Sequence, residues 1–308
     1  MRLVFFGSPE FAAYILEKLI SWKESQVVGV VTQPDKGVGR GRKIRPTPVK
    51  QVALAHNIDI LQPDSLKSKE IEEILKSYKA DLFVVVAYGL IIPKNIIEIP
   101  PFGIINVHAS LLPKYRGAAP IQWAILNGES VTGVTIMELD EGMDTGPILM
   151  QRPIAIKIDD TASDLHDKIK KHGAWLLRRA IKKIKNNEVV KIPQDNTLAS
   201  YAPKLTKEMG LIDFNDKAEN IHNKVRALYP WPMAFFNFKT QKGDIQVQIF
   251  PGKIGEKVKD LPPGKIIGVK DGYLEVACID KSYLIPKLKP QSSKVLSASA
   301  FACGYLKK

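Results

Sequence analysis

The sequence predicts an α/β chain in which a Rossmann-like, doubly wound and mostly parallel sheet precedes an OB-like β-barrel. In the first part, short strands that are apolar on both faces alternate with amphipathic helical segments, which is typical of parallel strands covered by helices. Beyond residue 205 the strands are short and are separated by glycine and proline, as in a small antiparallel barrel. The length of 308 residues accommodates two ordinary domains.

The opening of the chain sets the doubly wound pattern. A compact apolar strand is predicted at 3–6, and the turn Gly7-Ser8-Pro9-Glu10 leads into an amphipathic helix at 11–20. The next strand, at 27–32, is apolar on both faces and is therefore expected to be parallel and covered. Because the first turn holds one glycine and lacks the G-x-G-x-x-G spacing, the motif does not predict a dinucleotide site.

A basic segment follows at 33–50, and we predict it as a loop. No acidic residue follows Asp35 in this segment, and its cations are Lys36, Arg40, Arg42, Lys43, Arg45 and Lys50. Arginine forks match phosphate geometry, so the composition suits a polyanion, although a solvated surface loop has the same composition. The like charges and the low apolar content predict a mobile segment when no partner is bound.

The most apolar strand of the chain is predicted at 81–90, after a strand at 58–63 and a helix at 68–78. In an open α/β sheet the ligand crevice lies at the carboxyl ends of the strands. The end of this strand, at 86–92, is therefore expected to line that crevice. Most of its side chains are equally well explained as core.

Two polar side chains interrupt the next apolar strand, at 104–108. Asn106 and His108 are two residues apart, so the period of a strand places both on one face. Leu112-Pro113 ends the strand, and a glycine-rich loop about thirty residues later supplies the carboxylates of Asp140, Glu141 and Asp144. An amide, an imidazole and a carboxylate are the parts of an acyl-transfer site. A histidine satisfied inside the core is the alternative that the pattern alone leaves open.

The predicted sheet is completed by a helix at 118–126, a strand at 133–139 and a strand at 148–156 in an edge hairpin. Thr161 and Asp164 have the spacing of a capping box, which opens a long helix that ends near residue 185. The many cations on the polar side of this helix are interpreted as a solvated face.

The domain boundary is predicted where the periodicity stops. We assign 1–190 to a catalytic domain, 191–205 to a linker and 206–308 to the OB-like domain. The last part is expected to contain a helix at 216–228, a rigid turn at 229–232, and strands at 245–250, 264–269, 273–278 and 283–285. Lysine-rich tips of such a barrel would suit RNA, but barrels of this type also bind sugars and proteins.

Composition narrows the class of protein. The net charge of +13 favours a polyanionic partner, although many basic enzymes bind no nucleic acid. The two cysteines are too few for a disulfide scaffold and fit a reducing cytoplasm, and no metal is expected because no two of the five histidines have a ligand spacing. No apolar run approaches the roughly 20 residues of a membrane span, and the first residues do not resemble a signal peptide, so we expect a cytoplasmic protein without membrane attachment.

One long stretch resembles the signature of the folate-dependent formyltransferases. It runs from Asn106 to Ile121 as Asn-Val-His-Ala-Ser-Leu-Leu-Pro-Lys-Tyr-Arg-Gly-Ala-Ala-Pro-Ile, and Asp144 follows in Met-Asp-Thr-Gly. The Gly7-Ser8-Pro9 turn and the Ala227–Pro232 segment are also similar to this family, so the likeness extends along the chain. The Lys-Tyr-Arg-Gly-Ala-Ala-Pro continuation is most similar to the branch that formylates methionyl-tRNA.

The resemblance implies a reaction and a set of roles. The formyl group of 10-formyltetrahydrofolate would pass to the free amino group of methionyl-initiator tRNA, with a monomer as the expected state. The implied catalytic residues are Asn106, His108 and Asp144. The implied folate contacts are Ser110, Leu111, Leu112 and Pro113 together with Val86, Tyr88, Gly89 and Leu90. The implied tRNA contacts are Arg40, Arg42 and Lys43 of the basic segment.

Three other interpretations stay open. Glycinamide ribonucleotide and amino-sugar formyltransferases share the Asn, His and Asp set but do not need the basic segment. A formyltetrahydrofolate hydrolase domain would use the same site with water as the acceptor, within a longer chain. A catalytically inactive RNA-binding module would keep the charge, but the joint presence of Asn106, His108 and Asp144 argues against it.

Overall fold

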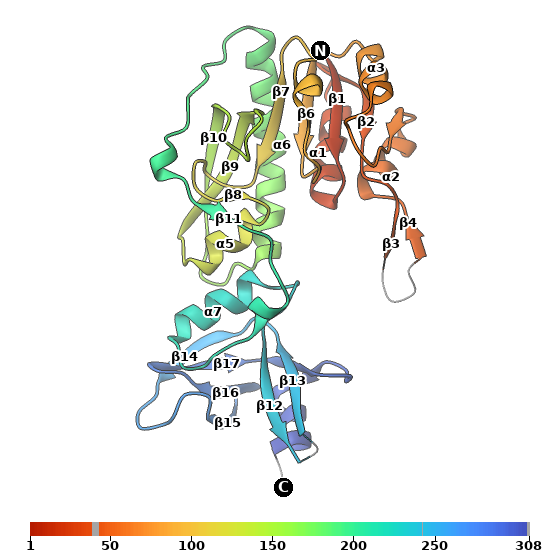
Figure 1. Ribbon diagram of the computed structural model, residues 1–308. Helices are drawn as coiled ribbons and strands as arrows, with labels where there is room; N and C mark the ends of the chain where they lie inside the picture. The colour runs from red at the N-terminus through yellow and green to blue at the C-terminus, as the bar shows by residue number, and fades with distance from the viewer. Residues whose placement is uncertain (39–42, 242, 307–308) are drawn as a thin grey trace. The chain divides into compact units, whose positions relative to one another are not determined.

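The chain divides into two units of different architecture in the computed structural model, which describes residues 1–38, 43–241 and 243–306 (Figure 1). The first unit comprises Met1–Gly117, Thr132–Ile154 and His166–Tyr201, and the second comprises Ala118–Val131, Ala155–Leu165 and Ala202–Lys308. The two units therefore alternate along the chain between residues 118 and 165. The linker assigned to 191–205 stays a prediction.

A seven-stranded sheet organises the first unit, in the order β10-β9-β7-β6-β1-β2-β5. Its strands are β1 (Arg2–Gly7), β2 (Gln26–Val31), β5 (Ile60–Leu61), β6 (Leu82–Val86), β7 (Ile104–His108), β9 (Val131–Glu138) and β10 (Ile148–Ala155). The pairs from β5 through β7 are parallel, and β9 is antiparallel to β7. The predicted Rossmann-like, mostly parallel sheet is confirmed.

Helices cover both faces of this sheet, as the doubly wound pattern predicts. They are α1 (Glu10–Ile20), α2 (Pro48–Ala55), α3 (Lys69–Ser77), α4 (Lys94–Ile97) and α6 (Ala162–Lys185). On one face, Ile104 of β7 belongs to a buried cluster with Leu75 of α3. On the other face, α6 approaches β7 so closely that a Cβ on Gly173 would lie 3.2 Å from a methyl group of Val107. Since strand residues alternate, the two polar residues of β7 lie on the Ile104 face, opposite α6.

The prediction of a loop throughout 33–50 is wrong for part of that segment. β3 (Lys36–Val38) and β4 (Lys43–Arg45) form an antiparallel hairpin, and α2 begins at Pro48. The Thr47 hydroxyl caps α2 by accepting a hydrogen bond from the Lys50 N–H at 3.1 Å. A threonine followed by proline is a helix-start signal, and the density of positive charge obscured it.

Antiparallel strands around one hydrophobic core form most of the second unit. They pair in two sheets of four, in the orders β12-β13-β18-β19 and β14-β17-β16-β15. The strands are β12 (Phe235–Thr240), β13 (Gly243–Ile249), β14 (Lys253–Lys257), β15 (Ile266–Lys270), β16 (Tyr273–Ala277), β17 (Lys281–Ile285), β18 (Lys287–Pro290) and β19 (Leu296–Ser297). The helices are α5 (Pro120–Leu126), α7 (Ala218–Ala227) and α8 (Ala298–Phe301). This architecture agrees with the OB-like domain that the sequence predicts.

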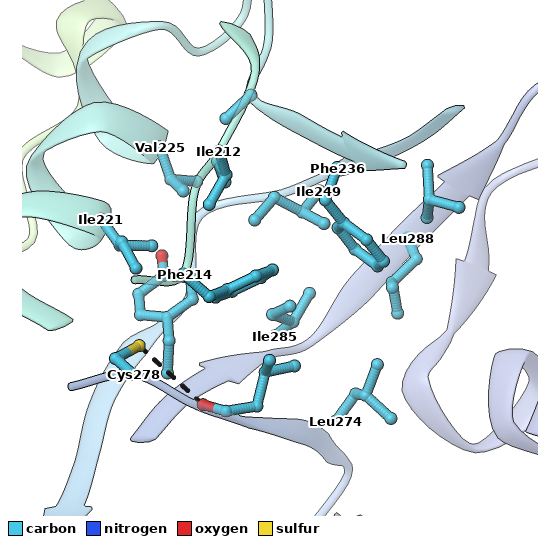
Figure 2. Close-up of a cluster of buried hydrophobic side chains, with 14 of the residues drawn as sticks. Ile212, Phe214, Ile221, Val225, Phe236, Ile249, Leu274, Cys278, Ile285 and Leu288 are labelled. Atoms are coloured by element: carbon cyan, nitrogen blue, oxygen red, sulfur yellow. Dashed lines mark hydrogen bonds between the residues drawn. The ribbon is translucent and has the colours of Figure 1, made fainter. Parts of the chain in front are cut away.

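The core of the second unit collects aromatic and aliphatic side chains from both sheets and from α7 (Figure 2). The rings of Phe214 and Phe236 meet edge to face with 5.7 Å between their centroids. Ile221 and Val225 project from α7 into the same cluster, which also holds the fully buried Tyr283. Each large side chain buried in this way contributes about 1.5–3 kcal/mol to stability. This core therefore stabilises a unit whose strands are short.

Two features are absent from the described residues. No helix there is long and apolar enough to cross a bilayer. No group of three or more His, Cys, Asp or Glu side chains there is arranged to hold a metal ion.

Candidate active site

Two polar side chains of β7 face a carboxylate from the loop between β9 and β10. Asn106 Nδ2 lies 3.4 Å from Asp144 Oδ1, and His108 Nδ1 lies 3.5 Å from Asp144 Oδ2. Asn106 is 9% exposed and His108 is 5% exposed. The structure therefore brings together the three predicted catalytic residues, at the carboxyl end of a central parallel strand.

Both ring nitrogens of His108 face hydrogen-bond acceptors. Nε2 lies 2.9 Å from the carbonyl oxygen of Tyr115, which can only accept, so Nε2 carries a hydrogen when this bond is made. Nδ1 faces Asp144, and an ionised carboxylate also can only accept. A doubly protonated imidazolium satisfies both contacts at once.

The backbone of Asp144 is in the left-handed region, with a φ of 56°. Aspartate is one of the few residues other than glycine that adopt this conformation routinely. The N–H of Gly117 donates to Asp144 Oδ2 at 2.8 Å, which fixes the carboxylate. The turn also requires a glycine at 146, because a Cβ there would lie 2.0 Å from the carbonyl oxygen of Glu138.

Two residues that the sequence analysis did not single out complete the surroundings of Asp144. Gln194 donates to the carbonyl oxygens of Asp144 and Gly146, at 2.8 and 2.7 Å. Its own amide oxygen accepts from Arg116, a guanidinium that is only 2% exposed. Arg116 lies inside the quoted signature, so the signature itself was a signal that could have found it. Gln194 lies in an aperiodic segment, where no pattern distinguishes it.

The predicted folate segment after β7 is fixed by hydrogen bonds within the protein. Thr135 Oγ1 donates to the Ser110 carbonyl at 2.7 Å, and Gln151 Nε2 donates to the Leu112 carbonyl at 2.8 Å. The carbonyls of Leu111 and Pro113 accept backbone N–H groups. The segment is therefore held rigidly beside the triad, and its contact with a folate stays a prediction.

The other predicted folate segment follows β6, the parallel neighbour of β7. Val86 ends β6 and is fully buried, and Gly89 turns the chain with a φ of 82°. Tyr88 is 2% exposed and meets the ring of Phe6 edge-on, and its burial raises the pKa of Tyr88 to about 12. Leu90 is 37% exposed, which leaves its side chain open to a ligand. A folate-binding role for these residues stays a prediction.

Of the three predicted tRNA contacts, the structure describes only the backbone of Lys43. Arg40 and Arg42 fall outside the described residues, and Lys43 begins β4, where its backbone pairs with Val38. At the base of the hairpin Lys50 forms an ion pair with Asp35 at 2.7 Å, and this hydrogen bond holds the pKa of the Asp35 carboxyl below its usual value. The base is therefore anchored, and the RNA contacts stay predictions.

Comparisons with known proteins agree along the chain. The family described as formyl transferase matches residues 1–181, and the family described as formyl transferase, C-terminal domain, matches residues 204–306. The chain is 44% identical to the methionyl-tRNA formyltransferase of Nitratidesulfovibrio vulgaris strain Hildenborough, over 99% of this chain and 93% of that protein. It is 45% identical to the methionyl-tRNA formyltransferase of Acetivibrio thermocellus, over 99% of this chain and 97% of that protein.

A solved structure supports the fold. The N-formyltransferase from Helicobacter canadensis, crystallised with folinic acid and dTDP-3-aminofucose, superposes with a TM-score of 0.64 at 24% identity. The superposition covers 92% of this chain and 97% of that chain. At this level of identity the likeness shows the fold alone.

Proposed function

This chain belongs to the formyl transferase family, and from that premise we propose that it transfers the formyl group of 10-formyltetrahydrofolate to the free amino group of methionyl-initiator tRNA. The product is N-formylmethionyl-tRNA, which serves translation initiation. The folate is a co-substrate and formyl donor, and no metal takes part. The observation that carries the proposal is the meeting of Asn106, His108 and Asp144 at the end of β7.

Asn106 supplies a hydrogen-bond donor to the transition state. The amine nitrogen attacks the formyl carbon, and negative charge builds on the formyl oxygen. The Asn106 amide nitrogen has two hydrogens, of which Asp144 takes one, so the other can be donated to that oxygen. One well-placed donor of this kind is worth about 3–4 kcal/mol.

His108 moves the proton of the reaction. Its Nδ1 faces Asp144, so Nε2 is the nitrogen that reaches the substrates, and it exchanges the Tyr115 carbonyl for them. A bond forms between the amine nitrogen and the formyl carbon, while the bond between that carbon and the folate nitrogen breaks. The proton lost by the amine ends on the folate nitrogen. Asp144 orients the ring and stabilises its cationic form.

The partner is a tRNA, which matches the charge of the protein. A net charge of +13 favours a polyanion, and the basic segment 33–50 and the lysine-rich second unit supply cations for phosphate contacts. We expect a monomer that works in the cytoplasm, where translation takes place.

A direct assay tests this function. The protein is incubated with 10-formyltetrahydrofolate and charged initiator methionyl-tRNA, and the released amino acid is analysed by mass spectrometry. N-formylmethionine should form with the natural chain, whereas His108→Ala and Asp144→Asn should reduce turnover to a small residual rate while circular dichroism shows an intact fold. Absence of formylmethionine with the natural chain would contradict the function, and full rates in either variant would contradict the site.

A further inference from the structure

We propose that Gln194 is a positioning residue that keeps the carboxylate of Asp144 facing Nδ1 of His108. It acts on the backbone of the loop between β9 and β10 and not on a substrate. The inference rests on the proposed function, which makes Asp144 catalytic. It extends the site to a segment beyond α6 that carries none of the predicted catalytic residues.

Gln194 bridges the turn that presents Asp144. Its Nε2 donates to the carbonyl oxygens of Asp144 and Gly146 at 2.8 and 2.7 Å, so the two hydrogens of one nitrogen span three consecutive residues. The left-handed backbone of Asp144, with its φ of 56°, is one that aspartate tolerates but that is still less favourable for a residue with a Cβ than the right-handed region. A clamp on both sides of residue 145 keeps the turn in that conformation.

The Gln194 amide fits in only one orientation. Its Oε1 accepts from Nε and Nη2 of Arg116 at 3.1 and 2.7 Å, and a guanidinium has donors only. The two loop carbonyls have acceptors only, so they require the Nε2 side. Because Arg116 is 2% exposed, its fork stays fixed behind the amide. The next residue, Gly117, donates its N–H directly to Asp144 Oδ2, so two adjacent residues support the carboxylate from one strand.

Loss of this clamp should impair the chemical step. The contact between His108 and Asp144 is 3.5 Å long, near the limit of a useful ion pair, so a small shift of the loop breaks it. A displacement of about 1 Å at a catalytic group can cost about 10²-fold in rate. Since the clamp acts on a catalytic group, the loss should fall on kcat, with KM little changed.

Three variants test the proposal. Gln194→Ala removes the clamp, and Gln194→Glu keeps the acceptor for Arg116 but turns an oxygen toward two carbonyls. Asn196→Ala is the matched control, because Asn196 Oδ1 accepts from the same guanidinium at 2.9 Å from the same segment. Both Gln194 variants should lower kcat by about 10- to 100-fold with KM for both substrates within about twofold, and the control should stay within about twofold of the natural chain. A raised KM with unchanged kcat would overturn the proposal, as would full activity.

A double-mutant cycle separates positioning from general stability. In an Asp144→Asn background, Gln194→Ala should cause less than about twofold further loss of the residual rate, because the carboxylate that it positions is already absent. An equal loss in both backgrounds would show a purely structural role and overturn the proposal.

Hydrogen exchange gives a readout that needs no substrate. The amides of residues 142–146 should exchange faster in Gln194→Ala than in Asn196→Ala or the natural chain. If the natural chain forms no formylmethionyl-tRNA, the proposed function fails, yet this measurement still reports on the clamp. Unchanged amide exchange in Gln194→Ala would contradict the proposal that Gln194 holds the loop. Faster exchange with unchanged kcat would contradict the proposal that this hold matters for catalysis.

Discussion

At the residue scale, the position of Asp144 sets the geometry of the candidate site. Its two carboxylate oxygens face different partners: Oδ1 faces Asn106, and Oδ2 faces both His108 and the Gly117 N–H. One carboxylate therefore orients the amide and the imidazole together. Any change that moves this side chain should disturb both donors of the site.

Replacing Asn106 by alanine should remove the donor to the formyl oxygen. We expect kcat to fall by about 10²- to 10³-fold, because one oxyanion donor is lost, with little change in KM. Steady-state kinetics of formyl transfer measure this. Asn95→Ala, which removes an exposed amide on α4, should be neutral, and a comparable loss there would point to a general effect of amide removal.

The two cysteines should differ in reactivity. Cys278 is 2% exposed, and its burial raises the pKa of the thiol to about 12, so little thiolate forms. Cys303 is exposed. Iodoacetamide under native, mildly alkaline conditions should modify Cys303 and leave Cys278 intact, as peptide mass spectrometry would show. Equal modification of both would contradict the packing of the second core.

The candidate catalytic residues were predictable only in part from a local rule. Asn106 and His108 share a face through the two-residue period of a strand, and the family resemblance supplied Asp144. Gln194 was not predictable, because its role depends on two backbone carbonyls about fifty residues away in the chain. Hydrogen bonds of that kind leave no periodic trace in a sequence.

At the element scale, the start of α6 is a separate test of the fold. The Asp164 N–H donates to Thr161 Oγ1 at 3.2 Å, and the Thr161 N–H donates back to Asp164 Oδ2 at 2.9 Å, which confirms the predicted capping box. Thr161→Ala should lower the free energy of unfolding by about 1 kcal/mol, measured by chemical denaturation. Thr161→Ser keeps the hydroxyl and should cost much less; equal losses would mean that the methyl group, and not the cap, matters.

The buried histidine of α7 should make stability depend on pH. Burial lowers the pKa of His222 below the usual 6.5, although the Ile158 carbonyl, which accepts from Nε2 at 2.8 Å, opposes the shift. Below pH 6.5 the unfolded chain therefore binds a proton that the folded chain does not. This contribution is fully present above that pH, falls as the pH drops, and levels off below the folded pKa.

Chemical denaturation from about pH 8 to about pH 5 measures this effect. His222→Gln, whose amide can still donate to Ile158, should show a smaller loss of unfolding free energy on acidification than the natural chain. A variant that loses as much as the natural chain would show that other groups cause the pH dependence.

Elements with strong periodicity were predictable, whereas short elements inside charged segments were not. Strand β7 was predicted with its observed bounds, because apolar residues surround its polar pair. The β3–β4 hairpin and the start of α2 were read as loop, because their stabilising contacts are backbone pairs and one threonine cap. Edges such as β5, which spans only Ile60–Leu61, depend on neighbouring strands that a local pattern does not contain.

At the scale of the whole molecule, net charge should govern the encounter with tRNA. The logarithm of KM for methionyl-tRNA should rise linearly with the logarithm of salt concentration, with a slope of about 0.9 for each duplex phosphate neutralised. KM for 10-formyltetrahydrofolate should change much less with salt, since the protein neutralises few charges when it binds a small ligand. A KM for methionyl-tRNA that does not change with salt concentration would contradict an electrostatic role for the net charge of +13.

The choice of acceptor distinguishes a methionyl-tRNA formyltransferase from the other formyltransferases and from a hydrolase. The protein is given labelled 10-formyltetrahydrofolate with charged initiator methionyl-tRNA, glycinamide ribonucleotide, an amino-sugar nucleotide and free methionine together, and the label in each product is measured. The label should pass to methionyl-tRNA and not to the small amines or to water. Transfer to a small amine would keep the site of Asn106, His108 and Asp144 but contradict the tRNA substrate, and release of formate alone would make the protein a hydrolase.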